Sequence, residues 1–128
     1  MNLLLDTHVL IWWATDDAKL SQKDRQFLAD PDHELYLSSV CLWEVAIKFG
    51  KGMLKIPPDL LRNRSLAAGF KSLQFTDLHA IEVARLPPVH QDPFDRALIA
   101  QAIAEPICLV TRDERLRGYA APIRFLNE

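Results

Sequence analysis

Residues 90–113 read HQDPFDRALIAQAIAEPICLVTRD and contain a helix start, a helix stop and a buried strand in succession. Asp92 is a favourable N-cap residue, and Pro93 suits the first helical position because its φ angle is fixed and it has no N–H to satisfy. Glu105-Pro106 ends the helix, since a residue before proline is disfavoured in the α region. The apolar run at 107–110 then predicts a strand buried on both faces. A helix that leads directly into a buried strand is typical of a crossover onto a parallel sheet.

Two acids of this stretch stand where a core segment ordinarily has none. Asp95 heads the apolar stripe of the predicted helix, which continues at Leu98, Ile99, Ala102 and Ile103. Asp113 follows the buried strand and therefore lies at its carboxyl end. Ligands of open parallel sheets collect at the carboxyl ends of the strands, so Asp113 marks a candidate site.

The rest of the chain repeats this alternation of strands and helices. Further strands are predicted at 2–5, 34–37, 71–75 and 123–126, and helices at 9–14, 21–29, 39–49, 59–68, 78–86 and 115–121. No repeat, low-complexity tract or long linker divides the chain. The pattern predicts an α/β fold: one domain, 1–128, folded as a three-layer α/β/α sandwich on a mainly parallel sheet of about five strands.

Two more acids interrupt apolar segments. Asp6 follows the buried strand 2–5, which repeats the arrangement of Asp113 at the end of its own strand. Glu44 falls inside the helix stripe marked by Val40, Trp43 and Ile47, so its carboxylate is expected to face the core. The three tryptophans of the chain are expected to lie in the core as well.

Composition excludes several classes of protein. The 128 residues are 49% hydrophobic and 25% charged, as in ordinary globular domains. The net charge of −2 gives no bulk basic field for nucleic acid. Cys41 and Cys108 lie in apolar runs without metal-binding spacing, which favours buried free thiols in a reducing compartment. No stretch is long enough to span a membrane and no signal peptide opens the chain, so a cytoplasmic location is expected.

Four ionised carboxylates in one cleft would repel each other, and burial would add to the cost. A divalent cation removes that cost. A ligand set made up of oxygen atoms alone favours Mg²⁺ or Mn²⁺ over zinc or copper. The matching chemistry is metal-assisted hydrolysis of phosphodiesters, in which the ion activates water and steadies the leaving oxygen. The hypothesis requires that Asp6, Glu44, Asp95 and Asp113 converge in the fold.

Each acid also has a structural alternative. Asp6 would cap the helix that follows it, and Asp113 would start the last helical turn. Asp95 would interact favourably with the positive end of the helix dipole. For Asp92, capping is the preferred role. Glu44 has no evident partner in the pattern and is the hardest to explain structurally.

Polar neighbours of these acids are expected to support the site or to bind a substrate. Three hydroxyls could orient the acids, with turn and cap roles as alternatives: Thr7, Ser39 and Thr111. His8 and His90 flank acids, and hydrogen-bonded structural roles are favoured over metal binding. Four basic residues near the predicted cleft could meet phosphates or remain solvated: Lys48, Arg96, Arg112 and Arg115.

Taken together, the motifs LLLDTH (with Asp6), SSVCLWEVAIK (Glu44), HQDPFDRALIAQA (Asp95) and VTRD (Asp113) resemble PIN-domain ribonucleases, particularly VapC-type toxins of bacterial toxin–antitoxin pairs. The likeness spans essentially the whole chain. It implies a Mg²⁺- or Mn²⁺-dependent endoribonuclease with these four acids as metal ligands, and it makes the basic residues candidate RNA contacts. It also implies a homodimer and inhibition by a small antitoxin whose tail occupies the cleft.

Other functions stay open at this point. One is a PIN-like nuclease that acts on structured DNA. Another is a magnesium phosphatase, disfavoured because no second aspartate stands two residues after Asp6. A third is a catalytically silent interaction module whose acids bind a basic segment of a partner.

Overall fold

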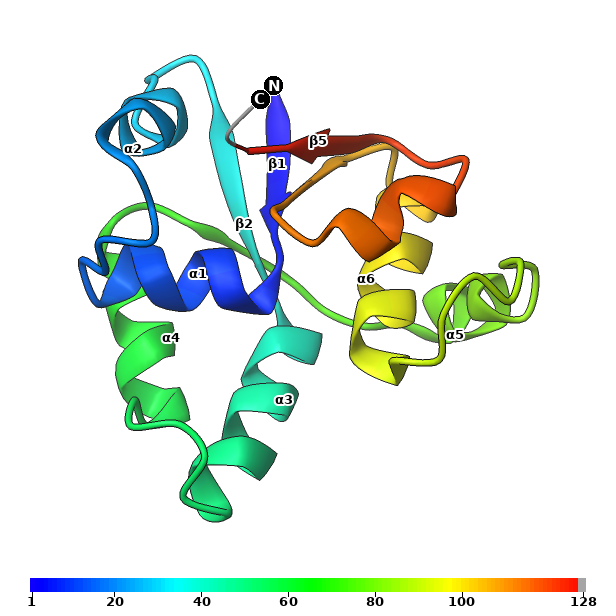
Figure 1. Ribbon diagram of the computed structural model, residues 1–128, viewed down its shortest axis with the longest axis horizontal. Helices are drawn as coiled ribbons and strands as arrows, with labels where there is room; N and C mark the ends of the chain where they lie inside the picture. The colour runs from blue at the N-terminus through cyan, green and yellow to red at the C-terminus, as the bar shows by residue number, and fades with distance from the viewer. Residues whose placement is uncertain (127–128) are drawn as a thin grey trace.

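The computed structural model describes residues 1–126 and contains a five-stranded sheet in the order β3-β2-β1-β4-β5 (Figure 1). All four strand pairings are parallel. The strands are β1 (Asn2–Leu5), β2 (Glu34–Ser38), β3 (Lys71–Leu73), β4 (Cys108–Thr111) and β5 (Ile123–Phe125). The parallel sheet confirms the predicted α/β class, and β5 lies at an edge as expected.

Six α-helices and one 3-10 helix connect the strands and flank the sheet. They are α1 (Thr7–Ala14), α2 (Gln22–Leu28), α3 (Ser39–Gly50), α4 (Pro58–Ala67), α5 (Asp77–Val83), α6 (Pro93–Ala104) and η1 (Glu114–Gly118). Helix α3 packs against α4 and α6, and α5 packs beside α6 (Figure 1). None of the helices within residues 1–126 is long and apolar enough to cross a membrane.

The order of the strands reverses between β1 and β4. From β1 the chain builds outward through β2 to β3, and it then returns to the other side of β1 to add β4 and β5. In open parallel sheets a crevice forms at such a reversal, outside the carboxyl ends of the two strands. Asp6 directly follows β1 and Asp113 stands two residues after β4, so both acids lie at this crevice.

The central strands are apolar because both faces of the sheet are covered. Leu3, Leu4 and Leu5 of β1 have no exposed surface, and neither do Leu109 and Val110 of β4. A strand buried on both faces needs apolar side chains at successive positions rather than at alternate ones. The continuous leucine run therefore fixes β1 in the middle of the sheet.

Polar caps start the helices where the sequence places them. Asp92 accepts a hydrogen bond from the N–H of Asp95 at 3.0 Å and caps α6, with Pro93 as its first residue. Ser38, one of the two serines expected in this role, caps α3 through the N–H of Val40 at 3.0 Å. The cap predictions are confirmed because they depend on local chemistry alone.

The predicted apolar stripe of α3 is wrong at one position. Trp43 is 58% exposed, whereas the buried residues of the helix are Val40, Cys41, Glu44 and Val45. Each residue advances a helix by about 100°, so a buried face centred between Cys41 and Glu44 leaves Trp43 on the rim. The indole packs edge-on against Phe94, with 4.9 Å between the ring centroids.

Helix α1 is less buried than its composition suggests. Only Thr7, Val9 and Leu10 are buried, and Trp12 and Trp13 are half-buried. Trp13 packs against Phe70, with 4.6 Å between the ring centroids. The prediction that these tryptophans lie in the core is therefore only partly met, and Trp13 comes closer to it because its ring packs against Phe70.

Two elements end earlier than predicted. Strand β3 stops at Leu73, because the N–H of Phe75 donates to the hydroxyl of Ser39 at 2.9 Å instead of continuing the sheet. Helix α5 stops at Val83, and the N–H of Leu86 bonds to its carbonyl in a tighter turn. Hydrophobic periodicity does not encode either ending. The first depends on a side-chain acceptor from another segment, and the second on a turn at the end of the helix.

A buried polar network joins β2 to α5 and α6. The hydroxyl of Ser38 donates to Oε1 of Gln101 at 2.6 Å, and Nε2 of Gln101 lies 3.4 Å from Nδ1 of His79. Nδ1 of His79 accepts from the N–H of Thr76 at 3.0 Å, so the proton of the neutral ring stands on Nε2, which faces Oε2 of Glu105 at 2.7 Å. The network holds the start of α3, the helix that carries Glu44.

Gln101→Leu is expected to destabilise the protein by about 1–3 kcal/mol, because it leaves the buried hydroxyl of Ser38 without its partner. Urea titration of the variant and the wild type measures the difference. Gln26→Leu, on the exposed face of α2, is the matched control and should stay within about 0.5 kcal/mol. Equal stability of the two variants would show that the network contributes nothing.

Candidate active site

Thr111 joins the two acids at the crevice between β1 and β4. Its Oγ1 donates to Oδ2 of Asp6 and accepts from the backbone N–H of Asp113 at 3.0 Å. The contact with Asp6 spans 105 residues of sequence and exists because β1 pairs with β4, whereas the contact with Asp113 is local. Thr111 therefore orients Asp6 and the start of the segment that carries Asp113, as expected for a supporting hydroxyl.

Asp6 is both a helix cap and a buried acid of the crevice. Its side chain is almost completely buried, and Oδ1 accepts from the N–H of Val9 at 2.9 Å, which caps α1. Burial raises the pKa of Asp6 to about 6, against the opposing effect of the hydrogen bonds from Thr111 and Val9. The capping and site predictions for Asp6 are thus compatible.

Asp95 lies in the first turn of α6 and faces the same crevice. Burial is the main reason that its pKa is raised, and the neighbouring charge of Asp92 adds to the effect. Nε2 of His90, 3.3 Å from Oδ2, acts in the opposite direction. The charge of Asp95 also raises the pKa of Asp6, so the two carboxylates lie within electrostatic range of each other.

Arg115 bridges the remaining acid of the crevice to Asp95. Its Nη2 lies 2.6 Å from Oδ2 of Asp113 and 3.8 Å from Oδ2 of Asp95. The hydrogen bonds from Arg115 lower the pKa of Asp113. One guanidinium therefore serves as the counter-ion of two acids that come from different elements.

Glu44 reaches the same region from α3. It is 4% exposed and forms an ion pair with Lys48 one helical turn further on. Burial raises the pKa of the Cys41 thiol to about 12, and the charges of Asp6 and Glu44 raise it as well. Cys41 thus lies within electrostatic range of both carboxylates.

Asp6, Asp95 and Asp113 are connected by electrostatic interactions, and Glu44 shares with Asp6 the buried neighbour Cys41. With Arg115 and Lys48 in place as counter-ions, no three His, Cys, Asp or Glu side chains within residues 1–126 are arranged to share one metal ion. Glu44, Asp95 and Asp113 thus have basic counter-ions within the chain, whereas Asp6 is held by the hydroxyl of Thr111 and the N–H of Val9.

A cavity of about 350 Å³ opens beside this cluster. It is lined by Asp6, His8, Trp12, Arg112, Asp113 and Arg115. The walls therefore combine two of the acids with two guanidinium groups and an indole ring.

The other predicted supporting residues divide into two groups. Thr7 is buried next to Asp6, and its Oγ1 has no hydrogen-bond partner among the described residues. Asp92 caps α6 and lies close enough to Asp95 to raise its pKa. Ser39 is the correction: its hydroxyl accepts from the N–H of Phe75 and fastens the connection after β3, so it does not support an acid.

Arg96 is the clear correction among the four predicted phosphate contacts. Its Nη1 donates to the carbonyl of Pro87 at 2.9 Å and to the hydroxyl of Tyr119 at 3.2 Å. Further contacts go to the carbonyls of Val83 and Leu86. A guanidinium bound in this way clamps the connection between α5 and α6 and has little capacity left for a phosphate.

Arg112 and Arg115 line the cavity, and Lys48 lies one helical turn from Glu44 on α3. Lys48 pairs with Glu44, and Arg115 pairs with two acids. Arg112 donates to the carbonyl of Lys19, and its guanidinium carbon lies 4.8 Å from the centre of the Trp12 ring. Each of these cations is positioned by a contact of its own.

The two histidines have the structural contacts that were favoured for them. Nδ1 of His90 lies 2.7 Å from the hydroxyl of Tyr119, and Nε2 faces Asp95. His8 is exposed, and its ring centroid lies 6.0 Å from that of Trp12. Neither Tyr119 nor the position of Trp12 beside the acids was predicted from the sequence. For Trp12 a signal existed, since it follows His8 by four residues and so shares its helix face.

The fold and this cluster of acids define a class of proteins. The chain belongs to the PIN-domain family, whose sequence profile matches residues 3–122. Within the family it is similar to the ribonuclease VapC22 of Mycobacterium tuberculosis (strain ATCC 25618 / H37Rv). The two are 31% identical over 123 residues, which cover 94% of each chain. The resemblance seen in the motifs is confirmed.

Solved structures with the same fold come from toxin–antitoxin complexes. VapBC2 of Rickettsia felis bound to a promoter DNA fragment matches with a TM-score of 0.72 and 16% identity over 98% of both chains. DNA-bound VapBC of Salmonella typhimurium matches with a TM-score of 0.64 and 19% identity. The match covers 98% of this chain and 96% of the other. A toxin–antitoxin complex of Klebsiella pneumoniae matches with a TM-score of 0.60 and 17% identity over 95% of both chains. At these identities the likeness confirms the fold.

Proposed function

We propose that the protein is a metal-dependent endoribonuclease that hydrolyses RNA phosphodiester bonds as the toxin of a toxin–antitoxin pair. The observation that carries the proposal is the cluster of Asp6, Glu44, Asp95 and Asp113 around the crevice between β1 and β4. The relative named a ribonuclease supports the choice of RNA as substrate.

The donor set fits Mg²⁺, with Mn²⁺ as a substitute. All four candidate ligands are carboxylates, and hard oxygen ligands favour these ions. Burial raises the pKa values of Asp6 and Asp95, and a bound cation would offset the cost of keeping these buried carboxylates ionised. A bound ion would supply Lewis-acid activation of water and of the phosphate.

The chain's own residues prepare this site. Thr111 fixes the carboxylate of Asp6 through a hydrogen bond, and His90 contacts the carboxylate of Asp95. Arg115 and Lys48 must leave the acids before those oxygens can bind a cation. Arg115 is 66% exposed, so its released guanidinium can turn toward a substrate phosphate without losing a buried position.

Two protein partners belong to the proposal. The toxin–antitoxin complexes among the structural matches support a small antitoxin, whose tail would cover the crevice. A homodimer is the expected assembly. Trp43 and Phe75 support it, because they are exposed aromatic residues that line a nearly apolar depression of about 260 Å³.

Incubation of the purified protein with labelled single-stranded RNA, RNA hairpins and DNA tests the proposal. Each reaction is run with Mg²⁺, with Mn²⁺ and with EDTA. We expect internal cleavage of RNA with either metal and none with EDTA. The double variant Asp6→Asn/Asp95→Asn, purified in parallel, controls for a contaminating ribonuclease.

Each other outcome overturns the proposal in a defined way. Cleavage of structured DNA in place of RNA would identify a PIN-like DNA nuclease. No cleavage of any substrate by folded wild-type protein would favour an interaction module whose acids bind a basic segment. Equal cleavage by the double variant would assign the activity to a contaminant.

A further inference from the structure

We propose that the cavity beside the acids is a nucleobase subsite, in which Trp12 stacks on an unpaired base of the RNA next to the phosphate held at the acids. The inference rests on the proposed function and adds how the site recognises its substrate. Asp6 and Asp113 line the cavity together with Trp12 and Arg112. A nucleotide bound with its phosphate at the acids would therefore extend its base toward the indole.

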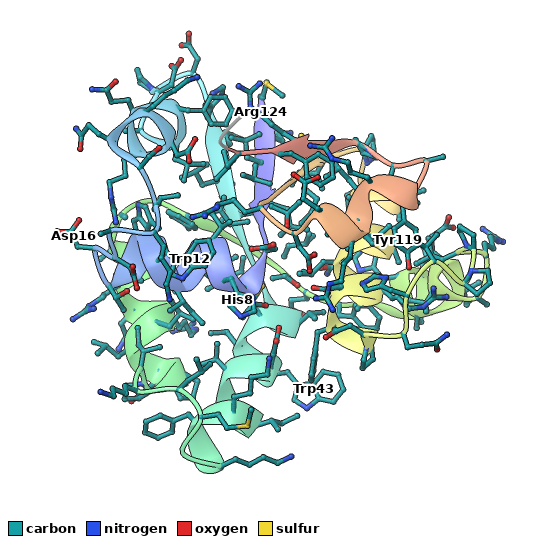
Figure 2. All side chains as sticks on the ribbon, viewed as in Figure 1. His8, Trp12, Asp16, Trp43, Tyr119 and Arg124 are labelled. Atoms are coloured by element: carbon teal, nitrogen blue, oxygen red, sulfur yellow. The ribbon has the colours of Figure 1, made fainter. Side chains whose placement is uncertain are left out.

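The position of Trp12 is fixed relative to the acids. Asp6 caps α1, so the helix starts at the acid itself, and Trp12 follows on the face that also carries His8. The His8 and Trp12 ring centroids lie 6.0 Å apart. Figure 2 shows the two residues on α1, separate from Trp43 on α3. A short, capped helix thus presents an aromatic surface beside the reactive groups.

Charge beside Trp12 favours a base together with its phosphate. The guanidinium of Arg112 lies over the Trp12 ring at 4.8 Å and is anchored to the carbonyl of Lys19. Bases stack on aromatic rings and on guanidinium planes, and cations attract the phosphate backbone. Because Arg112 and Trp12 are stacked on each other, the base would stack on this guanidinium–indole pair.

A purely structural role explains Trp13 better than Trp12. The Trp13 ring packs on Phe70 and does not line this cavity. The neighbouring Trp12 is half-buried and forms part of the cavity wall. Both indoles pack against the core, and of the two only Trp12 also lines this cavity.

The substrate class that fits is single-stranded RNA or an RNA loop. In a duplex the bases are stacked on one another, and their faces are closed to a side chain. An unpaired base can leave the strand and stack on the indole, which is tolerant of base identity because every base has a π-face. The subsite therefore predicts a preference for unpaired regions over paired ones.

RNA binding by stacking variants tests the subsite. Fluorescence anisotropy of a short labelled single-stranded RNA is measured with Asp95→Asn protein, which is expected to bind without cleaving. Adding Trp12→Leu keeps an apolar side chain but removes the ring, and we expect affinity to fall roughly 10- to 100-fold. Adding Trp12→Phe instead should restore most of the affinity. Phe49→Leu, which changes an exposed aromatic residue of α3 outside the cavity, is the matched control and should leave affinity unchanged.

A base-deletion scan makes the result specific for stacking. Abasic nucleotides are placed one at a time along the RNA, and one position should reproduce the loss caused by Trp12→Leu. At that position the two changes should not add, because both remove the same contact. Full affinity of a folded Trp12→Leu variant, or additive losses at every position, would overturn the subsite. Wild-type cleavage of RNA with no effect of Trp12 would refute only the subsite, whereas absence of cleavage would refute the proposed function.

Discussion

Glu44→Gln is expected to reduce metal-dependent RNA cleavage at least about 100-fold while the protein remains folded. The glutamine has nearly the same shape but no charge, so it fits the buried position and loses its attraction for a divalent ion. Metal ions stabilise transition-state charge by several kcal/mol, and each 1.36 kcal/mol changes a rate tenfold. Glu44 is 4% exposed and paired with Lys48, which can turn to water when the charge is removed.

Cleavage rates and Mn²⁺ affinity measured by calorimetry check this expectation. Mn²⁺ binding should weaken together with cleavage, because both depend on the same oxygen atoms. Asp24→Asn is the matched control, since Asp24 is equally buried but belongs to α2 and lies outside the crevice. Full activity of Glu44→Gln would remove this residue from the metal site and leave its burial as a feature of the core.

Asp6→Asn is expected to stabilise the metal-free protein above about pH 7 by up to about 3 kcal/mol. Burial raises the pKa of Asp6 from 3.8 to about 6, so the folded protein above that pH must hold a buried charge that the unfolded chain exposes to water. Asparagine retains an oxygen to cap α1 and carries no charge. The expected gain is therefore the removal of an unfavourable charge.

The pH dependence gives the sign of this effect. Between pH 3.8 and about 6 the folded state binds more protons at Asp6 than the unfolded state, so the stability of the wild type falls as pH rises through that window. The gain in unfolding free energy of Asp6→Asn over the wild type should grow between pH 3.8 and about 6 and vanish below pH 3.8. Urea titrations in EDTA measure both proteins. The exposed Asp59→Asn on α4 should show no such gain.

Addition of Mg²⁺ should reverse the order of stability. A ligand that binds only the folded state stabilises it in proportion to the logarithm of its concentration above Kd. The wild type should therefore gain stability with Mg²⁺, and Asp6→Asn should gain much less. An asparagine variant that is less stable than the wild type at every pH in EDTA would show that the carboxylate is held favourably without metal.

The sequence by itself determined the order of the elements and the ends that have a local signal. The cap at Asp92, the stop before Pro106 and the leucine run of β1 act through local backbone chemistry and burial, so they could be predicted from neighbouring residues. The burial of Glu44 was predicted from helical periodicity, although the same periodicity misplaced Trp43. A small error in the phase of a helix is enough to exchange a rim residue with a core residue.

Only the tertiary structure decided which side chains meet. Pairing of β1 with β4 brings Thr111 to Asp6, and no local pattern encodes that choice of neighbour. The fold also gives different partners to arginines that look alike in sequence. Arg96 donates its hydrogen bonds mainly to backbone carbonyls, whereas Arg115 bridges two acids. A side chain's partners depend on distances between remote segments. Periodicity and propensity report on one segment at a time, so they cannot supply those distances.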